Sequence, residues 1–253
     1  MNSGSWETVM SDAGDAFDAH YALWTDERKD VASTKKEWAR ISQLAEISHR
    51  EYRILDAPCG QARFADPITS AGHEYVGVDR SPFMIEHAKA KSSAQVVLIT
   101  RDIEDCTFDM EFDLAINWFT SFGYDSDQSS KRCLERLYSA LKPGGRLVME
   151  IMNGQWLLNN LSATEKIVQT FDMTYGTVRD VNYVTADGIW HIMDRTYDYS
   201  GSQSHSSFAM RVLTADALTN WLHDAGFQSV DIFGSDERPL TNSDPRMHVV
   251  AVR

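Results

Sequence analysis

The sequence is poor in cysteine and has no cysteine spacing that is typical of a cross-linked or metal-binding protein. Its 253 residues include only Cys59, Cys106 and Cys133, an odd number without a C-x-x-C pair. This argues against a disulfide framework and against a zinc site, and it suits a reducing compartment. A chain of this length buries enough surface to fold without such staples. We therefore expect no metal site.

Long apolar runs are also lacking. No stretch approaches the roughly 20 apolar residues of a membrane-spanning helix. The N-terminal sequence MNSGSWETVMSDAGDAFDAH is acidic and has neither the basic nor the apolar region of a signal peptide. These features predict a cytoplasmic protein that does not bind a membrane.

Positive charge is scarce as well. The chain has 24 Lys and Arg residues against 37 Asp and Glu residues, a net charge of -13, and no long run of basic residues. A protein that binds nucleic acid needs a basic surface to displace the counterions of the phosphates. Nucleic acid is therefore disfavoured as a partner, whereas the negative field favours encounter with small cations such as amines.

Strand and helix patterns alternate through the middle of the chain. Hydrophobic periodicity and turn residues predict strands at 53–57, 75–79, 96–100, 112–117 and 146–151, with helices at 62–70, 81–91 and 127–141. Strands that alternate with helices form a parallel sheet with crossover helices. The predicted fold class is therefore α/β, with a doubly wound, mostly parallel sheet.

The two ends of the chain depart from this alternation. Aromatic and aliphatic residues recur at helical spacing before residue 50, with a break at 30–34. Further on, the pattern predicts antiparallel strands at 176–183, 189–197 and 208–213, a helix at 214–225 and strands at 228–233 and 248–252. We thus expect four parts: a helical lid at 1–50, an α/β core at 51–155, a β-rich insertion at 156–213, and the last helix and strands of the core at 214–253.

Acidic residues stand at the ends of three successive predicted strands. Asp56 ends the first strand, Asp79 ends the second, and Asp102 follows the third. Ligands of open α/β sheets bind at this edge, and Gly60 lets the backbone approach a ligand closely. Asp79 can accept hydrogen bonds from the ribose of an adenosine, and Asp102 is placed to take the adenine amino group beside Ile103.

A dinucleotide is the first alternative ligand for such an edge. Its pyrophosphate needs G-x-G-x-x-G at the start of a helix, and residues 59–64 contain one glycine only. The carboxylate of Asp56 before this turn would repel a pyrophosphate, whereas it suits the cationic end of an amino acid. The dinucleotide hypothesis is therefore rejected.

The segments D-A-P-C-G-Q-A-R, V-G-V-D, R-D-I and L-K-P-G-G-R-L-V-M-E together resemble the class I S-adenosylmethionine-dependent methyltransferases over residues 50–152. The resemblance implies a Rossmann-like sheet of seven strands, N-terminal lid helices, an antiparallel β insertion over the active site, and S-adenosyl-L-methionine as cofactor. Where the family usually has a second glycine, Ala62 is expected to crowd the loop near the methionine moiety. The cofactor-binding residues that the resemblance implies are Tyr21, Asp56, Ala57, Gly60, Arg63, Asp79, Arg80, Met84, Asp102, Ile103, Asn117 and Phe119.

The aromatic segment N-W-F-T-S-F-G-Y at 117–124 resembles small-molecule N- and O-methyltransferases of bacterial antibiotic and amino-sugar biosynthesis, with lincosamide and deoxyamino-sugar N-methyltransferases as the nearest types. The resemblance implies a small-molecule acceptor. We hypothesise that the hydroxyl of Tyr124 orients the acceptor. The substrate-binding residues expected from the resemblance are Trp24, Trp118, Phe122 and Tyr124. Arg195 is a further candidate from the sequence itself, because a guanidinium can pair with an acidic group on the acceptor.

Several questions stay open at this stage. The acceptor atom is nitrogen, oxygen or carbon, and a general base, if one is needed, is sought among His191, His205 and Glu150. RNA or protein acceptors are disfavoured by charge and by N-W-F-T in place of an N-P-P-Y-type tetrad. A relative that binds the cofactor without transferring methyl is a further alternative. The oligomeric state is open, although aromatic N-terminal helices often form contacts in homo-oligomers.

Overall fold

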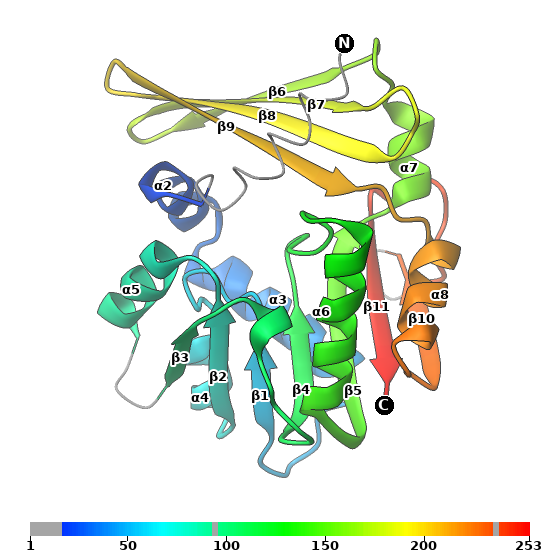
Figure 1. Cartoon of the computed structure of the whole chain (residues 1–253). Coiled ribbons are helices and arrows are strands. Elements are labelled where there is room, and N and C mark those ends of the chain that lie inside the picture. Colours follow the sequence, from blue (N-terminus) through cyan, green and yellow to red (C-terminus); the bar gives the residue numbers. More distant parts are fainter. Residues whose placement is uncertain (1–16, 93–95, 235–237) are drawn as a thin grey trace.

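The computed structural model describes residues 17–92, 96–234 and 238–253. Its larger sheet has seven strands in the order β10-β11-β5-β4-β1-β2-β3 (Figure 1). The strands β1 to β5 are mutually parallel, whereas β11 runs antiparallel to both β5 and β10. The predicted doubly wound, mostly parallel sheet is confirmed. Its strands are β1 (Arg53–Asp56), β2 (Glu74–Asp79), β3 (Val97–Thr100), β4 (Phe112–Asn117), β5 (Leu141–Met152), β10 (Ser229–Phe233) and β11 (Arg246–Val252).

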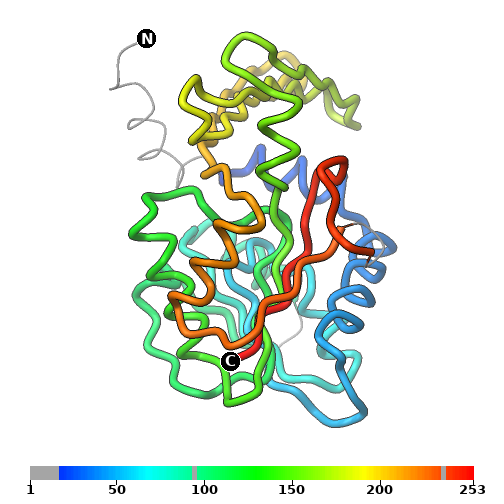
Figure 2. Tube along the Cα trace, turned by 90° about the vertical axis from the view of Figure 1, so that its right-hand side faces the viewer, coloured from blue at the N-terminus to red at the C-terminus, as the bar shows by residue number. Residues whose placement is uncertain are grey.

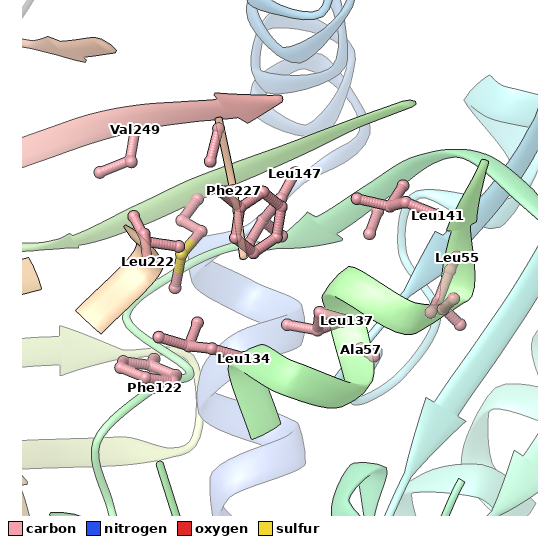
Figure 3. Packing of buried hydrophobic residues seen from close by; sticks show 14 of the residues in the cluster. Leu55, Ala57, Phe122, Leu134, Leu137, Leu141, Leu147, Leu222, Phe227 and Val249 are labelled. Atoms are coloured by element: carbon pink, nitrogen blue, oxygen red, sulfur yellow. The ribbon is translucent and has the colours of Figure 1, made fainter. Parts of the chain in front are cut away.

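Helices cover both faces of this sheet, as Figure 2 shows for α8 on one side and α3 on the other. One apolar cluster joins α6 (Asp127–Ala140) and α8 (Ala215–Asp224) to the sheet, and Figure 3 shows Leu134, Leu137 and Leu222 within it. A second cluster packs α3 (Val31–Leu44), α4 (Ala65–Ser70) and α5 (Pro82–Lys91) on the opposite face. Each fully buried leucine contributes about 1.5–3 kcal/mol of transfer free energy.

A second sheet lies above the carboxyl ends of the parallel strands (Figure 1). It is antiparallel, in the order β6-β7-β8-β9. The helix α2 (Ala19–Arg28) lies between the two sheets in both views. The strands are β6 (Ile167–Met173), β7 (Gly176–Val184), β8 (Trp190–Tyr199) and β9 (Ser202–Arg211), preceded by the helix α7 (Gly154–Asn160).

The observed boundaries differ from the predicted ones for local reasons. The helix predicted from 62 begins at Ala65, because Ala62 has a φ of 53° and belongs to the preceding turn. The predicted break at 30–34 is shorter, because Asp30 caps α3 and accepts a hydrogen bond from the Ser33 amide. The strand predicted at 208–213 begins at Ser202, and its serine-rich first half hid the pattern. The elements β6 and α7 were not predicted.

The N-terminal helical lid was predicted from residue 1, and its first sixteen residues lie outside the described ranges. Among the described residues, no helix is long and apolar enough to cross a membrane.

Candidate active site

The turn after β1 is tied to the end of β2 by one carboxylate. Asp79 accepts the Gly60 amide through Oδ2 and the Ser81 amide through Oδ1, both at 2.8 Å. Gly60 has a φ of 53°, and a Cβ placed on it would meet no atom within 4 Å. The turn therefore leaves open space beside its backbone. Burial raises the pKa of Asp79, and the two amide hydrogen bonds oppose this shift.

Asp56 is the second carboxylate at this edge. Its side chain is buried and accepts a hydrogen bond of 2.8 Å from the Tyr75 hydroxyl. Burial raises its pKa to about 7, while the Tyr75 hydrogen bond and the charge of Arg63 oppose the shift. A ligand cation beside Asp56 would favour the ionised form.

Three cavities adjoin at the strand ends. The Asp102 cavity has a volume of about 130 Å³, the Asp56 cavity about 60 Å³, and the second-sheet cavity about 410 Å³. Tyr21 of α2 lines all three cavities. Tyr124 lines the first and the third, and Phe119 lines the second and the third. These aromatic residues therefore mark the junction of the cavities.

The Asp102 cavity lies at the ends of β2 and β3. Asp102 caps the short helix η1 (Ile103–Asp105) and accepts the Glu104 amide at 3.1 Å. Arg80 lies between two carboxylates, with Nη1 at 3.7 Å from Asp102 Oδ2 and 3.0 Å from Asp125 Oδ2. The expected cofactor residues on its wall are Tyr21, Gly60, Asp79, Arg80, Met84, Asp102 and Ile103.

The Asp56 cavity presents opposite charges to a ligand. Asp56 lies on its wall together with Arg63. Arg63 pairs with Glu37 through Nη2, whereas its Nη1 is buried and has no hydrogen-bond partner in the described ranges. An amino acid fits such a wall, because its ammonium group suits Asp56 and its carboxylate suits the free donor of Arg63.

Four of the expected site residues do not line the cavity that their expected role suggests. Ala57 and Asn117 lie beneath the turn, where Asn117 Nδ2 donates to the Ala57 carbonyl at 2.9 Å, and neither lines a cavity. Trp118 lines the Asp56 cavity, and its indole N–H donates to Glu37 at 3.1 Å. Phe122 lines the Asp102 cavity and packs in the α6–α8 cluster. Trp118 and Phe122, which the resemblance implied as substrate-binding residues, thus line the Asp56 and Asp102 cavities and not the second-sheet cavity.

The expected crowding by Ala62 is not observed. Ala62 is 4% exposed and packs in the apolar cluster on the α3 face. It lines none of the three cavities. Its methyl group is therefore accommodated in the core, although a φ of 53° is a conformation that favours glycine.

The second-sheet cavity is bounded below by the strand ends and above by the second sheet. Trp24 and Tyr124 line it as expected, together with Arg195. Arg195 Nε and Nη2 donate to the two carboxylate oxygens of Asp180 at 2.6 and 2.7 Å, and both side chains are buried. The guanidinium lies 3.7 Å from the ring centroid of Trp24. Arg195, predicted as a substrate-binding residue, is therefore paired with Asp180 through two of its three guanidinium nitrogens.

The sequence analysis missed several residues of this cavity, among them Asp180, Phe208 and Arg246. Asp180 pairs with Arg195 in the β7–β8 register. This register can be obtained from the sequence by counting residues outward along both strands from the turn at Ala186-Asp187-Gly188. That signal was present in the sequence. By contrast, Arg246 comes from β11, and only the sheet order brings it beside Glu150, where its Nη1 lies 2.9 Å from Oε1.

The candidate bases differ in their placement. His205 bonds to Thr196 on β8 and does not line the cavity. His191 lines it, but burial lowers its pKa to about 4. Glu150 also lines it; although burial opposes the shift, His248 and Arg246 hold its pKa below the usual value. Both shifts oppose proton uptake by these two groups at neutral pH.

Comparisons with known proteins agree with this geometry. Residues 54–145 match the model of a methyltransferase domain. The 18S rRNA (guanine-N(7))-methyltransferase of Bos taurus is 30% identical over 107 residues, which are 39% of this chain and 38% of that protein. The chain thus spans about two fifths of the length of that relative.

Solved structures match over most of their length. The CcbJ methyltransferase from Streptomyces caelestis has a TM-score of 0.76 at 15% identity, covering 96% of this chain and 97% of the other. CalS10 from Micromonospora echinaspora, an amino pentose methyltransferase involved in calicheamicin biosynthesis, has a TM-score of 0.70 at 18% identity, covering 92% and 96%.

The fold is therefore that of the S-adenosylmethionine-dependent methyltransferases, and residues 54–145 form a methyltransferase domain. This methyltransferase domain agrees with the sequence resemblance and supports S-adenosyl-L-methionine as the predicted cofactor. The open space at Gly60 and the free Nη1 of Arg63 fit this cofactor.

Proposed function

We propose that this chain methylates a nitrogen or oxygen atom of a small, natural-product-like or amino-sugar-like acceptor held in the second-sheet cavity. The observation that carries the proposal is the junction at Tyr21, Phe119 and Tyr124, because the acceptor cavity meets both cofactor cavities only there among the described residues. A volume of about 410 Å³ is typical of small-molecule sites.

The roles of the cofactor-side residues follow from their placement. Asp79 and Asp102 would bind the adenosine, and Asp56 and Arg63 would bind the amino-acid end. The cofactor, when bound, supplies the methyl group on a sulfonium cation. Aromatic faces near such a cation contribute about 0.5–2 kcal/mol each. This attraction acts before the transition state too, so it aids binding more than rate.

Most of the rate enhancement would come from holding the acceptor in line, which can supply roughly 7–11 kcal/mol. Burial raises the pKa of Tyr124, so its hydroxyl stays protonated and can donate a hydrogen bond. Tyr124 is therefore suited to orient an acceptor atom and unsuited to act as a base.

RNA is a second candidate acceptor, favoured by the rRNA methyltransferase among the relatives. A net charge of -13 opposes the approach of a polyanion. Two further alternatives are a protein acceptor and a chain that binds the cofactor without transferring its methyl group. The methylated products of an enzyme assay distinguish these alternatives.

The first test is calorimetric titration with S-adenosylmethionine and S-adenosylhomocysteine. We expect micromolar binding that Asp79→Ala abolishes, because the Gly60 and Ser81 amides lose their acceptor along with the ribose. Asp172→Asn, an exposed change on β6, is the matched control. Incubation of the enzyme with S-adenosylmethionine and panels of amines and alcohols would then be followed by mass spectrometry. No binding by the folded wild-type protein would overturn the proposal, and so would a methylated RNA or protein without any methylated small molecule.

A further inference from the structure

We propose that the acceptor carries a negatively charged group, a carboxylate or a phosphate, which binds beside Arg28 and Arg195. This inference rests on the proposed function, since it assumes that the second-sheet cavity receives the acceptor. It also reverses the expectation from net charge, which favoured cationic small molecules. The charges on the cavity wall differ in sign from the net charge of the whole chain.

Positive groups outnumber negative groups on this wall. Among the described residues it holds the cations Arg28, Lys29, Arg195 and Arg246, but the anions Glu150 and Asp180 only. Both carboxylates are already paired: Glu150 Oε1 lies 2.9 Å from Arg246 Nη1, and Asp180 Oδ1 lies 2.6 Å from Arg195 Nε. The cavity therefore offers no free carboxylate that could bind a cationic acceptor.

Arg28 is the cation of this wall that lacks a counterion. Lys29 pairs with Glu37 at 2.6 Å, whereas Arg28 makes no ion pair with any described carboxylate. The Arg28 guanidinium lies 4.2 Å from the ring centroid of Phe171 and 5.7 Å from that of Trp24. These two rings flank the guanidinium at the exposed end of α2, so a cation is held at the rim of the cavity.

Arg195 is the second donor and lies inside the cavity. Two of its three guanidinium nitrogens bind Asp180, but Nη1 is buried and has no hydrogen-bond partner within the described ranges. Its side chain is 2% exposed. The guanidinium groups of Arg28 and Arg195 lie within 5.7 Å of the same Trp24 ring centroid. A ligand anion in this cavity would be attracted by the charge of Arg28, and an anion that reaches Arg195 would satisfy its free donor.

The test compares three amino sugars that share one ring and differ at C6. Glucosamine carries a hydroxyl there, glucosaminuronic acid a carboxylate, and glucosamine 6-phosphate a phosphate. Calorimetry would measure their binding to the protein saturated with S-adenosylhomocysteine, with acetate and inorganic phosphate as probes that need no sugar pocket. We expect at least one anionic sugar to bind about tenfold more tightly than glucosamine, with an affinity that falls as salt rises.

Arg28→Gln should remove this preference and leave the affinity for S-adenosylhomocysteine unchanged. Arg179→Gln is the matched control, because Arg179 is exposed on β7 next to Asp180, lies outside the cavity and undergoes the same change of charge. It should keep the preference. Arg28 and Arg179 are both exposed, so neither change should disturb the fold. The melting temperature of each variant checks this.

Equal or tighter binding of glucosamine would overturn the inference. The inference also fails if no anionic sugar, acetate or phosphate binds at millimolar concentration. It fails too if Arg28→Gln keeps the preference for the anionic sugars. The relative affinities of glucosaminuronic acid and glucosamine 6-phosphate show whether the site prefers a carboxylate or a phosphate. The affinity for S-adenosylhomocysteine is measured in the same samples. If S-adenosylhomocysteine does not bind, the proposed function fails. If it binds but the anionic sugars are not preferred, only this inference fails.

Discussion

At the scale of single residues, burial changes the chemistry of Asp56. Its pKa of about 7 lies well above the ordinary 3.8, so the carboxyl group changes its charge near neutral pH. The native state holds a proton that the unfolded chain releases, and the contribution of Asp56 to stability therefore falls as pH rises from 3.8 to about 7. Binding of a ligand ammonium requires the ionised form and has the opposite dependence on pH.

We therefore expect affinity for S-adenosylhomocysteine to fall as pH drops below about 7, by up to roughly tenfold per pH unit. Calorimetry between pH 5.5 and 8 would measure this slope. In Asp56→Asn the affinity should be lower and nearly flat over the same range. A variant with the slope of the wild type would show that another group titrates.

Tyr124 is the residue at which orientation of the acceptor can be tested. Tyr124→Phe removes the hydroxyl and keeps the ring, and we expect kcat to fall by about ten- to hundredfold with little change in cofactor affinity. Tyr124→Ala should weaken cofactor binding as well, because the ring lines the Asp102 cavity. The acceptor found by the screen and a methyl-transfer assay serve for both variants.

Tyr175→Phe is the matched control, since Tyr175 is 60% exposed between β6 and β7. Unchanged turnover in both Tyr124 variants would mean that the side chain only packs against its neighbours, such as Phe17 at a centroid distance of 5.7 Å.

At the scale of elements, a buried ion pair joins β7 to β8 and supports α2. Asp180 and Arg195 face each other in the register of these strands, and Trp24 of α2 lies against the guanidinium. Charges removed from water are costly unless both partners are present. The pair thus couples the position of α2, and with it Tyr21, to the second sheet.

Asp180→Asn would leave the charge of Arg195 buried without a counterion. We expect a loss of about 3–5 kcal/mol in the free energy of unfolding, measured by urea denaturation. Asp172→Asn on the exposed face of β6 should change it by less than about 0.5 kcal/mol.

The double variant Asp180→Leu with Arg195→Met should recover most of this stability, because apolar side chains of similar volume need no counterion. An equally large loss in the double variant would show that the strands depend on more than this pair.

At the scale of the whole molecule, the two sheets contribute different walls of the candidate site. The larger sheet brings Asp56, Asp79 and Asp102 to one edge, because the carboxyl ends of parallel strands meet there. The second sheet lies above that edge and forms the upper wall of the acceptor cavity (Figure 1). On the proposed function, the larger sheet would hold the cofactor, and the side chains of the second sheet would select the acceptor.

How far the sequence predicts this site depends on the distance between contacting residues. Asp79 and the Ser81 cap of α5 were predicted because their signals are local, within two or three residues. Trp118 and Phe122 were assigned to the acceptor side from the resemblance alone, and no local signal indicated the geometry of the segment that follows β4. It bends at Phe119 and Thr120, whose φ angles are 63° and 58°, and this bend redirects the side chains.

The sequence by itself determined the α/β class, the edge at which the ligand binds and the acidic residues there, since strand order along the chain and turn composition are sufficient for these. Only the tertiary structure decided that the Asp180–Arg195 pair is buried, that Arg246 faces Glu150, and that the second-sheet cavity is cationic within an acidic chain. The reason is physical: Arg246 and Glu150 come from segments far apart in the sequence, and the burial of charged groups, which no local pattern records, sets the charge that a ligand meets.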